Sequence, residues 1–101
     1  MNFGLKNESI EKINSVFLKY AEIESAIIYG SRAKGNFHHG SDIDLTLKGN
    51  KINLNTLLII ENELDDLLLP YQIDLSIYEH IENQELLTHI NRIGKIFYLK
   101  K

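Results

Sequence analysis

Hydrophobic and polar positions follow two periods along this chain, one typical of helices and one typical of strands. Apolar residues recur every three or four positions in three segments, and we expect these to form helices. The first segment begins at Asn7 or Ser9 and runs to about residue 20, the second covers residues 54–69, and the third runs from residue 84 to about residue 92. A side-chain cap is expected at the start of the first helix, Pro70 should stop the second, and Gly94 should close the third.

Shorter apolar runs between these segments predict strands. They cover residues 25–29, 42–48, 72–78 and 96–99, with a short helix expected at residues 31 to about 36. The third run alternates, with Ile73, Leu75 and Ile77 on one face and Asp74 and Ser76 on the other. Strands that alternate with helices around a hairpin-like middle predict an α/β or α+β fold, a single domain with a mixed sheet flanked by helices.

The second long helix carries more apolar residues than one packed face needs. Its apolar residues cover an arc of roughly 200°, whereas a helix packed on one side uses a little over about 100°. These residues are Leu54, Leu57, Leu58, Ile60, Leu64, Leu67, Leu68 and Leu69. Two interpretations are open: either the helix is nearly enclosed in the core, or its surplus edge is a docking surface for another protein.

Composition narrows the class of protein. The 101 residues are expected to form one domain over residues 1–101, and a content of 44% hydrophobic and 25% charged residues is ordinary for a soluble protein. Without cysteine, neither a disulfide framework nor a thiolate zinc site is possible. No signal peptide or apolar run of about 20 residues is present, so we expect a cytoplasmic protein without a membrane partner. A net charge of −3, from 11 basic and 14 acidic residues, disfavours a protein that binds extended nucleic acid.

A Gly-Ser pair, Gly30 and Ser31, follows the first expected strand. At a strand-to-helix turn this pair offers backbone N–H groups to phosphate oxygens, with no Cβ in the way at Gly30. Ser31 can alternatively be a simple helix cap, and one residue can serve both purposes. Two cations follow, Arg32 and Lys34. Each either neutralises the charge of a triphosphate or is merely a solvated side chain.

Ten residues after that pair, two aspartates stand one residue apart, Asp42 and Asp44. On a strand both carboxylates would project from one face, about 6.5 Å apart along it. That separation suits two acids that share a pair of divalent cations about 3.5–4 Å from each other. The alternative is a solvated acidic turn, which is common for Asp near Gly and Ser. A phosphate-binding turn beside a pair of metal-binding acids predicts a nucleoside triphosphate bound with magnesium.

Asp74 is the candidate third carboxylate. Its neighbours on the expected strand are mainly apolar, and an unpaired acid is costly to bury there unless it shares a cation with Asp42 and Asp44. The alternative is an edge-strand acid that faces water. Ser41, directly before the acidic pair, is expected to brace the carboxylates and is grouped with the nucleotide-binding residues.

Three more side chains near these residues are not expected to bind metal or nucleotide. His38 and His39 are adjacent, and adjacent residues of a strand face opposite ways, so they are expected in an exposed loop and not as ligands of one ion. Tyr29 is expected to be part of the core and not to stack on a nucleotide base.

The combined pattern is Gly30-Ser31, a ten-residue spacer, and then Asp42-Ile43-Asp44-Leu45. It resembles the signature of the nucleotidyltransferase superfamily that includes DNA polymerase beta. Within that superfamily the chain is most similar to the minimal nucleotidyltransferases, the antitoxin partners of HEPN-domain toxins, over nearly its whole length. The resemblance implies that Asp42, Asp44 and Asp74 are catalytic and bind two Mg²⁺ ions, with Asp74 helping to deprotonate the acceptor. The nucleotide-binding residues would then be Gly30, Ser31, Arg32, Lys34 and Ser41.

The resemblance also implies a reaction and a partner. An acceptor hydroxyl would attack the α-phosphorus of ATP in line and release pyrophosphate, and the acceptor would be a tyrosine of a cognate HEPN ribonuclease toxin. The 101 residues leave none for a separate acceptor domain, so we expect the acceptor to arrive on a partner in a toxin–antitoxin assembly. Two other classes stay open: a degenerate nucleotidyltransferase that only occludes its toxin, and an enzyme that adenylylates a small molecule such as an aminoglycoside.

Overall fold

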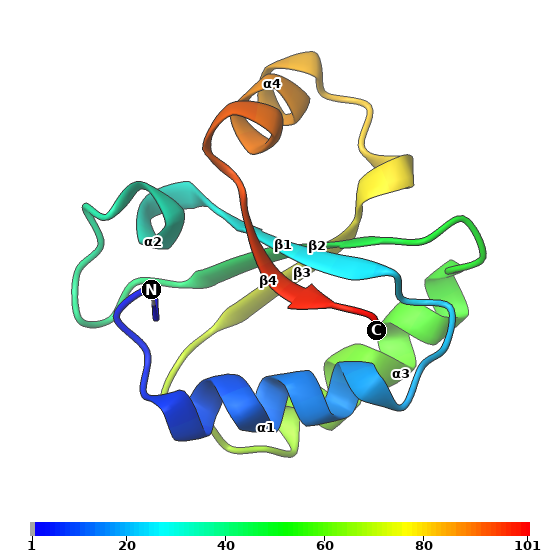
Figure 1. Ribbon diagram of the computed structural model, residues 1–101, viewed down its shortest axis with the longest axis horizontal. Coiled ribbons are helices and arrows are strands. Elements are labelled where there is room, and N and C mark those ends of the chain that lie inside the picture. Colours follow the sequence, from blue (N-terminus) through cyan, green and yellow to red (C-terminus); the bar gives the residue numbers. More distant parts are fainter. Residues whose placement is uncertain (1) are drawn as a thin grey trace.

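The computed structural model describes residues 2–101, which form a four-stranded mixed sheet with helices on both faces (Figure 1). The helices are α1 (Asn7–Leu18), α2 (Gly30–Lys34), α3 (Leu54–Asp65) and α4 (Gln84–Ile93), with one 3₁₀ turn, η1 (Tyr78–His80). The strands are β1 (Ser25–Tyr29), β2 (Ile43–Lys48), β3 (Ile73–Ile77) and β4 (Lys95–Leu99). This arrangement confirms the expected α/β class with a mixed sheet.

The strand order across the sheet is β3-β2-β1-β4. β1 pairs antiparallel with both β2 and β4, whereas β2 and β3 are parallel. Two parallel neighbours need a long crossover between them, and α3 makes this crossover. The order leaves β3 and β4 as the edge strands.

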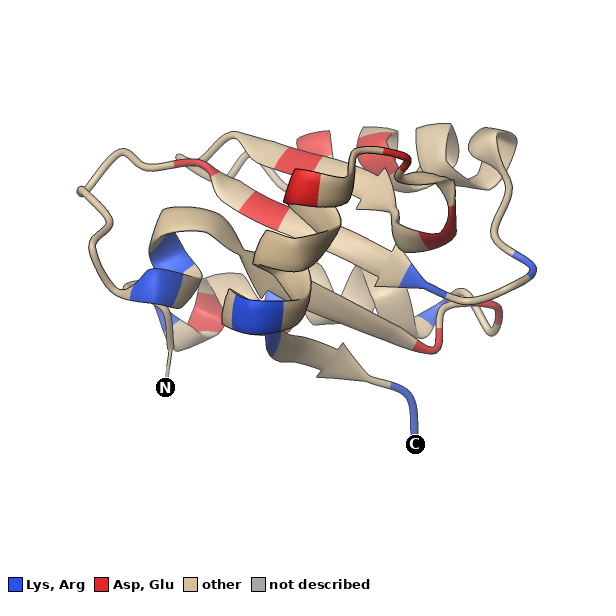
Figure 2. Ribbon diagram, turned by 90° about the horizontal axis from the view of Figure 1, so that it is seen from above, with Lys and Arg blue, Asp and Glu red and all other residues tan. Residues whose placement is uncertain are grey.

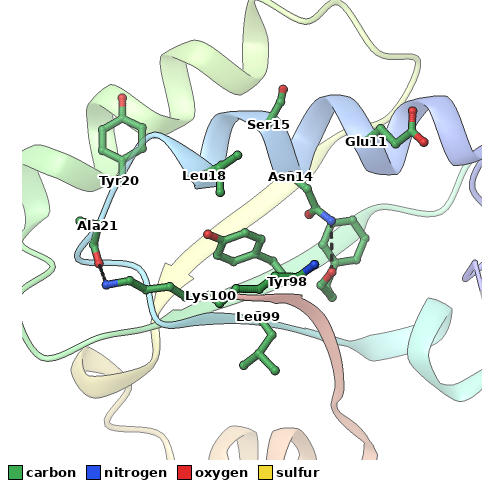
Figure 3. Close-up of a pocket in the computed structure, with 11 residues that line it drawn as sticks. Glu11, Asn14, Ser15, Leu18, Tyr20, Ala21, Tyr98, Leu99 and Lys100 are labelled. Atoms are coloured by element: carbon green, nitrogen blue, oxygen red, sulfur yellow. Dashed lines mark hydrogen bonds between the residues drawn. The ribbon is translucent and has the colours of Figure 1, made fainter.

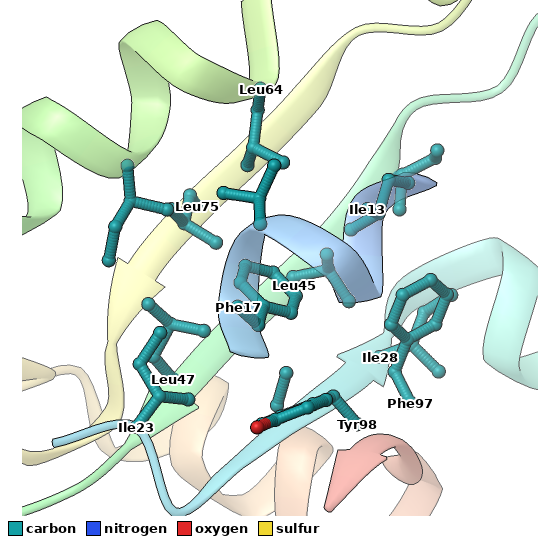
Figure 4. Packing of buried hydrophobic residues seen from close by; sticks show 14 of the residues in the cluster. Ile13, Phe17, Ile23, Ile28, Leu45, Leu47, Leu64, Leu75, Phe97 and Tyr98 are labelled. Carbon is teal, nitrogen blue, oxygen red and sulfur yellow. The ribbon is translucent and has the colours of Figure 1, made fainter. Parts of the chain in front are cut away.

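One face of the sheet is the hydrophobic core, and α1 and α3 cover it (Figures 1 and 4). Ile13 and Phe17, four residues apart on α1, are completely buried, as are Leu45 and Leu47, two residues apart on β2. The rings of Phe17 and Tyr98 meet edge to face with their centroids 5.7 Å apart. Burying a side chain of this size stabilises the fold by about 1.5–3 kcal/mol. This face therefore holds the sheet and the two helices together.

The last strand brings two consecutive aromatic residues into the same core. Neighbouring residues of a regular strand face opposite sides of the sheet. Here the pairing of β4 with β1 shifts register between Ala26 and Ile27, and both Phe97 and Tyr98 are buried. An irregularity of this kind re-aims one side chain, so the edge strand closes the core with both rings.

The first helix begins and ends differently from the prediction. Its N-cap residue is Lys6, which makes no side-chain cap hydrogen bond, so neither Asn7 nor Ser9 caps the helix. Asn7 is already its first residue, and the helix ends at Leu18 instead of residue 20. The cap predicted from the sequence was wrong because several consecutive polar residues could each have started the helix.

The third helix ends at Asp65, four residues before the predicted end. The N–H groups of Leu67 and Leu68 donate to carbonyls three residues back, which tightens the chain into a turn. Leu68 then takes a positive φ of 55°. Because Pro70 disfavours helical conformation in the residue before it, the chain leaves the helix early.

The apolar arc of α3 is divided between core and solvent. Leu57, Ile60 and Leu64 are buried against the sheet, while Leu54 is 61% exposed and Leu58 is 53% exposed. The interpretation that this helix is nearly enclosed is therefore wrong, and its surplus apolar edge faces outward. Within residues 2–101, no helix is both long enough and apolar enough to cross a membrane.

Candidate functional site

α4 lies on the other face of the sheet (Figure 1), and part of this face carries polar side chains. Tyr29 on β1 is the register partner of Asp44 on β2, and Asp44 is the register partner of Asp74 on β3. Register partners project from the same face, so these three side chains form one row across three strands. Seen from the side of α4, acidic positions lie on neighbouring strands of the sheet (Figure 2).

The three aspartates predicted from the sequence are neighbours in this structure. Asp42 is exposed and directly precedes β2, Asp44 is half-buried, and Asp74 is exposed on the edge strand. Burial raises the pKa of Asp44 above its ordinary value, and the charges of Asp74 and Asp42 raise it further. The charges of Asp42 and Asp74 are therefore close enough to repel an ionised Asp44.

Asp74 reaches this position for a different reason from the one given by the sequence. The sequence left two interpretations open, an acid buried among apolar neighbours that shares a cation and an edge-strand acid that faces water. The Asp74 side chain is exposed on the edge strand β3. Its apolar neighbours on β3 point to the opposite face, as their alternation predicted. What places it at the site is its register with Asp44 across the parallel β2–β3 pair.

Gly30 forms the turn that joins β1 to α2. Its φ is +74°, a left-handed conformation that L side chains rarely adopt. A Cβ on this residue would lie 2.3 Å from Oδ2 of Asp44, so only glycine lets the turn and the carboxylate approach each other. The motif therefore has a physical basis here: Gly30 and Asp44 pack directly together, with Ser31 next along the turn.

His89 on α4, which the sequence analysis did not single out, contacts both Gly30 and Tyr29. We call the group of Gly30, Asp44, Tyr29 and His89 the corner of the candidate site. The N–H of Gly30 donates a hydrogen bond to Nε2 of His89, with 3.1 Å between the two nitrogens. The imidazole also meets the ring of Tyr29 edge to face, with centroids 6.1 Å apart. One signal was available in the sequence: His89 interrupts the inward-facing stripe of Leu86, Ile90 and Ile93 on the last helix.

Tyr29 lies at this corner and not in the core. It is half-buried on the polar face, between Asp44 and the imidazole of His89. Burial raises the pKa of Tyr29, the nearby Ser76 hydroxyl opposes that rise, and the charges of Asp44 and Asp74 add to it. The hydroxyl of Ser76 in turn donates to Oγ1 of Thr46 at 2.8 Å, which links β3 to β2 on this face.

Arg32 has a different place from either sequence interpretation, since it is neither solvated nor turned toward a phosphate. Only 1% of its surface is exposed. Its guanidinium donates to the carbonyl oxygens of Phe3 and Ser41, and it lies over the rings of Phe37 and Tyr71. This arginine is therefore a structural centre that ties the N-terminal segment to the loop before β2.

Ser41 and the remaining predicted residues lie around that loop. The Ser41 hydroxyl accepts a hydrogen bond from the N–H of His38, and its carbonyl accepts from Arg32, so Ser41 braces the loop and not the carboxylates. Lys34 is exposed at the end of α2. His38 and His39 are exposed, as predicted.

The donor groups at this corner fit magnesium in kind. Carboxylate oxygens are the ligands that Mg²⁺ prefers. Burial and the charges of Asp74 and Asp42 raise the pKa of Asp44, and a bound cation would favour its ionised form against both. As the side chains stand, residues 2–101 contain no group of three His, Cys, Asp or Glu placed to hold an ion. A shared ion at Asp42, Asp44 and Asp74 therefore requires their side chains to turn toward it, and the metal site stays a prediction.

A groove of about 710 Å³ lies elsewhere, between α1 and the edge strand β4 (Figure 3). Leu18, Tyr98 and Leu99 are among its lining residues, and its walls are mainly apolar. It contains neither the Gly30 turn nor the aspartates. Its size does not make it the candidate site for a triphosphate, because the Gly30 turn and the carboxylates suited to phosphate and magnesium lie outside it.

Comparison with known proteins gives the family and the fold. The family model described as "Polymerase beta, Nucleotidyltransferase" matches residues 11–101. A toxin–antitoxin structure with AMP-PNP has a TM-score of 0.71 and 18% identity, covering 96% of this chain and 76% of that one. A structure of a tri-AMPylated Shewanella oneidensis HEPN toxin in complex with MNT antitoxin has a TM-score of 0.69 and 14% identity, with 95% and 74% covered.

A third structure, a putative nucleotidyltransferase from Sulfolobus solfataricus, has a TM-score of 0.56 and 17% identity, covering 91% of this chain and 78% of that one. No curated protein sequence matches the chain. At these identities the structural likeness establishes the fold alone, whereas the family rests on the match over residues 11–101.

Proposed function

This chain belongs to the polymerase beta nucleotidyltransferase family, and from that premise we propose that it transfers AMP from ATP to a tyrosine hydroxyl of a HEPN-domain toxin. AMP addition would inactivate the toxin, which makes the protein an antitoxin. The observation that carries the proposal is the corner where Gly30 packs against Asp44 and Asp44 pairs in register with Asp74. It combines a backbone turn suited to phosphate with carboxylates suited to magnesium.

The proposed reaction is an in-line substitution at the α-phosphorus. The acceptor oxygen forms a bond to that phosphorus while the bond from phosphorus to the bridging oxygen of pyrophosphate breaks. The acceptor proton passes to Asp74, which is exposed and therefore accessible to a hydroxyl on another protein. Magnesium bound at Asp42, Asp44 and Asp74 would neutralise phosphate charge and lower the pKa of the acceptor hydroxyl.

The rest of the corner would hold and orient the triphosphate. Ser31 can donate its hydroxyl and its amide to phosphate oxygens, and Gly30 leaves room for them because it has no side chain. Lys34 is exposed one helical turn further along α2 and remains available as a cation. Arg32 is not part of this proposal, since its donors are used by backbone carbonyls.

Two features support a protein acceptor. The solved structures of similar fold include the Shewanella oneidensis HEPN toxin in complex with its MNT antitoxin. In this chain, the outward edge of α3 exposes Leu54, Leu58 and Ile59, and this edge or the segment from Gln84 onward would contribute to docking. A specific interface buries at least about 1,000 Å² with an apolar centre.

The test is co-purification with the product of the adjacent gene, which the proposal expects to be a HEPN protein, followed by intact mass measurement of that partner. With ATP and magnesium we expect its mass to rise by one or more AMP units, with one pyrophosphate released for each. The matched control is the Asp42→Asn, Asp44→Asn double variant, which should still bind the partner and add nothing.

Two results would redirect the assignment. A stable pair that gains no AMP under any condition would favour an antitoxin that only occludes its toxin. AMP transfer to a small molecule in the absence of any protein partner would favour the drug-modifying class. Full activity of the double aspartate variant would contradict the proposed site itself.

A further inference from the structure

We propose that His89 is a positioning residue of the nucleotide site, which holds the Gly30 peptide and through it the relation between the turn and Asp44. The inference rests on the proposed nucleotidyl transfer. It adds to that function a residue from α4, outside the motif that joins the Gly-Ser pair to the two aspartates.

Two contacts meet at Gly30, and a third fixes the imidazole beside it. The Gly30 N–H donates to Nε2 of His89, and its Cα side faces Oδ2 of Asp44 with no room for a Cβ. The rings of Tyr29 and His89 meet edge to face. A nitrogen that accepts this hydrogen bond carries a lone pair, so the neutral ring has its proton on Nδ1. His89 therefore orients the peptide that separates the strand from the phosphate-binding turn.

This support is needed because α2 has no local cap. Its N-cap residue, Tyr29, makes no side-chain cap hydrogen bond. The first N–H groups of a helix lack partners within the helix, and at Gly30 the missing acceptor comes from a residue 59 positions later in the chain. Glycine also has more backbone freedom than any other residue, so without that acceptor the peptide can rotate and move Ser31 away from a phosphate.

The position of α4 does not depend on His89 alone. Ile90 is buried, and Gly94 lies so close to the sheet that a Cβ there would come within 2.6 Å of Ile27. The hydroxyl of Tyr78 donates to Oδ1 of Asn91 at 2.9 Å. A substitution at His89 should therefore disturb the turn while the helix stays docked.

The experiment measures the affinity of the full-length protein for ATP with magnesium, by calorimetry and without any partner protein. His89→Ala should weaken binding by roughly two- to tenfold, the range expected for one net hydrogen bond. His89→Gln, whose side-chain oxygen can accept from the Gly30 N–H, should restore most of it. Asn91→Ala is the matched control: it also removes one hydrogen bond of α4, but it should bind like the parent.

A second readout does not depend on any variant. Nitrogen NMR of the His89 ring should show a protonated Nδ1 and a lone pair on Nε2, and this state should persist when ATP and magnesium are added. A tighter-binding His89→Ala variant, or a ring that loses the Gly30 contact when nucleotide binds, would show that His89 competes with the nucleotide and would overturn the proposal.

The remaining outcomes separate this inference from the proposed function. If the parent binds ATP and His89→Ala binds equally well, the inference fails and the proposed function stands. If the parent does not bind ATP with magnesium at all, the proposed function fails and this inference fails with it. If His89→Ala does not fold, weak binding by a folded His89→Gln variant would still overturn the positioning role.

Discussion

The same strands present buried apolar side chains on one face of the sheet and polar side chains on the other. Toward α1 and α3, β2 presents Leu45 and Leu47, which are completely buried. Toward α4, the same strand presents Asp44 and Thr46, and Asp44 lies in a row with Asp74 on β3. The period of two in a strand lets each residue serve one face without disturbing the next.

The difference shows that the residues that stabilise the fold and the residues of the candidate site lie on separate faces of the sheet. The core face gains free energy from buried apolar area. On the polar face, burial and neighbouring charges raise the pKa of Asp44, so the ionised site weakens the fold at neutral pH. The strands can carry an unfavourable cluster of acids because their other face holds them in place.

The largest effect is expected from Asp44→Asn. Loss of this carboxylate should reduce the proposed AMP transfer on the order of a thousandfold or more, because it removes charge from the proposed site of reaction. The same change should raise the melting temperature at pH 7 without magnesium, since it removes repulsion from Asp42 and Asp74. A variant that is less stable than the parent would contradict the view that this face weakens the fold.

The stability that Asp44→Asn gains over the parent should increase with pH. Asp44 has a raised pKa in the folded state, so the folded protein binds its proton more tightly than the unfolded chain does. The advantage of Asp44→Asn should therefore be full above the raised pKa. It should shrink as the pH falls through that pKa and disappear below the ordinary value of 3.8. Thermal melts of both proteins across this range measure it.

On the core face, Phe17→Ala should destabilise the protein by about 3–5 kcal/mol, because it leaves a cavity between α1 and the sheet. Urea unfolding measures this loss. Leu18→Ala is the matched control on the same helix: Leu18 is 73% exposed, and its loss should change stability by no more than about 0.5 kcal/mol. Equal losses in the two variants would mean that the core is not where the structure places it.

Gly30→Ala tests whether the Gly30 turn contributes both to the stability of the fold and to the proposed AMP transfer. A positive φ should cost the alanine variant about 1–2 kcal/mol of stability, and its Cβ would also push against Oδ2 of Asp44. Gly35→Ala is a close control, since Gly35 has a φ of +90° but no atom within 4 Å of an added Cβ. Both variants should lose stability, and only Gly30→Ala should also lose AMP transfer. Equal transfer by the two would separate the Gly30 turn from the chemistry.

The smallest effect is expected at a polar contact on the core side. Tyr20 donates a hydrogen bond to Glu63, which raises the pKa of Tyr20 from 10.0 to about 12. This bond contributes stability that is complete below pH 10 and is lost as the pH rises toward 12. Tyr20→Phe should remove that part of the pH dependence. Urea midpoints of both proteins from neutral to alkaline pH check it, and identical profiles would contradict the assignment.

Much of the fold follows from local patterning. The strand predicted at residues 25–29 has those bounds in the structure, and Leu75 and Ile77 face the core as their alternation with Asp74 and Ser76 required. These predictions succeed because a period of two or 3.6 residues depends only on neighbours in the chain. Helix ends were less predictable, since the end of α3 depends on how the chain turns before Pro70.

The candidate site shows the same division. Gly30, Asp42 and Asp44 could be selected from the sequence as candidates because few residue types suit phosphate and magnesium, and the structure brings them together with Asp74. Arg32 could not be assigned in that way. A charged side chain beside a phosphate-binding motif suggests a ligand contact, and its burial depends on Phe3, Phe37, Tyr71 and Ser41.

The sequence by itself determined which residues alternate between a core face and a polar face, and which of them have the chemistry for a nucleotide. Only the tertiary structure decided that β2 and β3 pair in a register that aligns Asp44 with Asp74. It also decided that His89 reaches back 59 residues to Gly30. The physical reason is that periodicity is a local property, whereas register and long-range hydrogen bonds depend on how all the elements pack around one core.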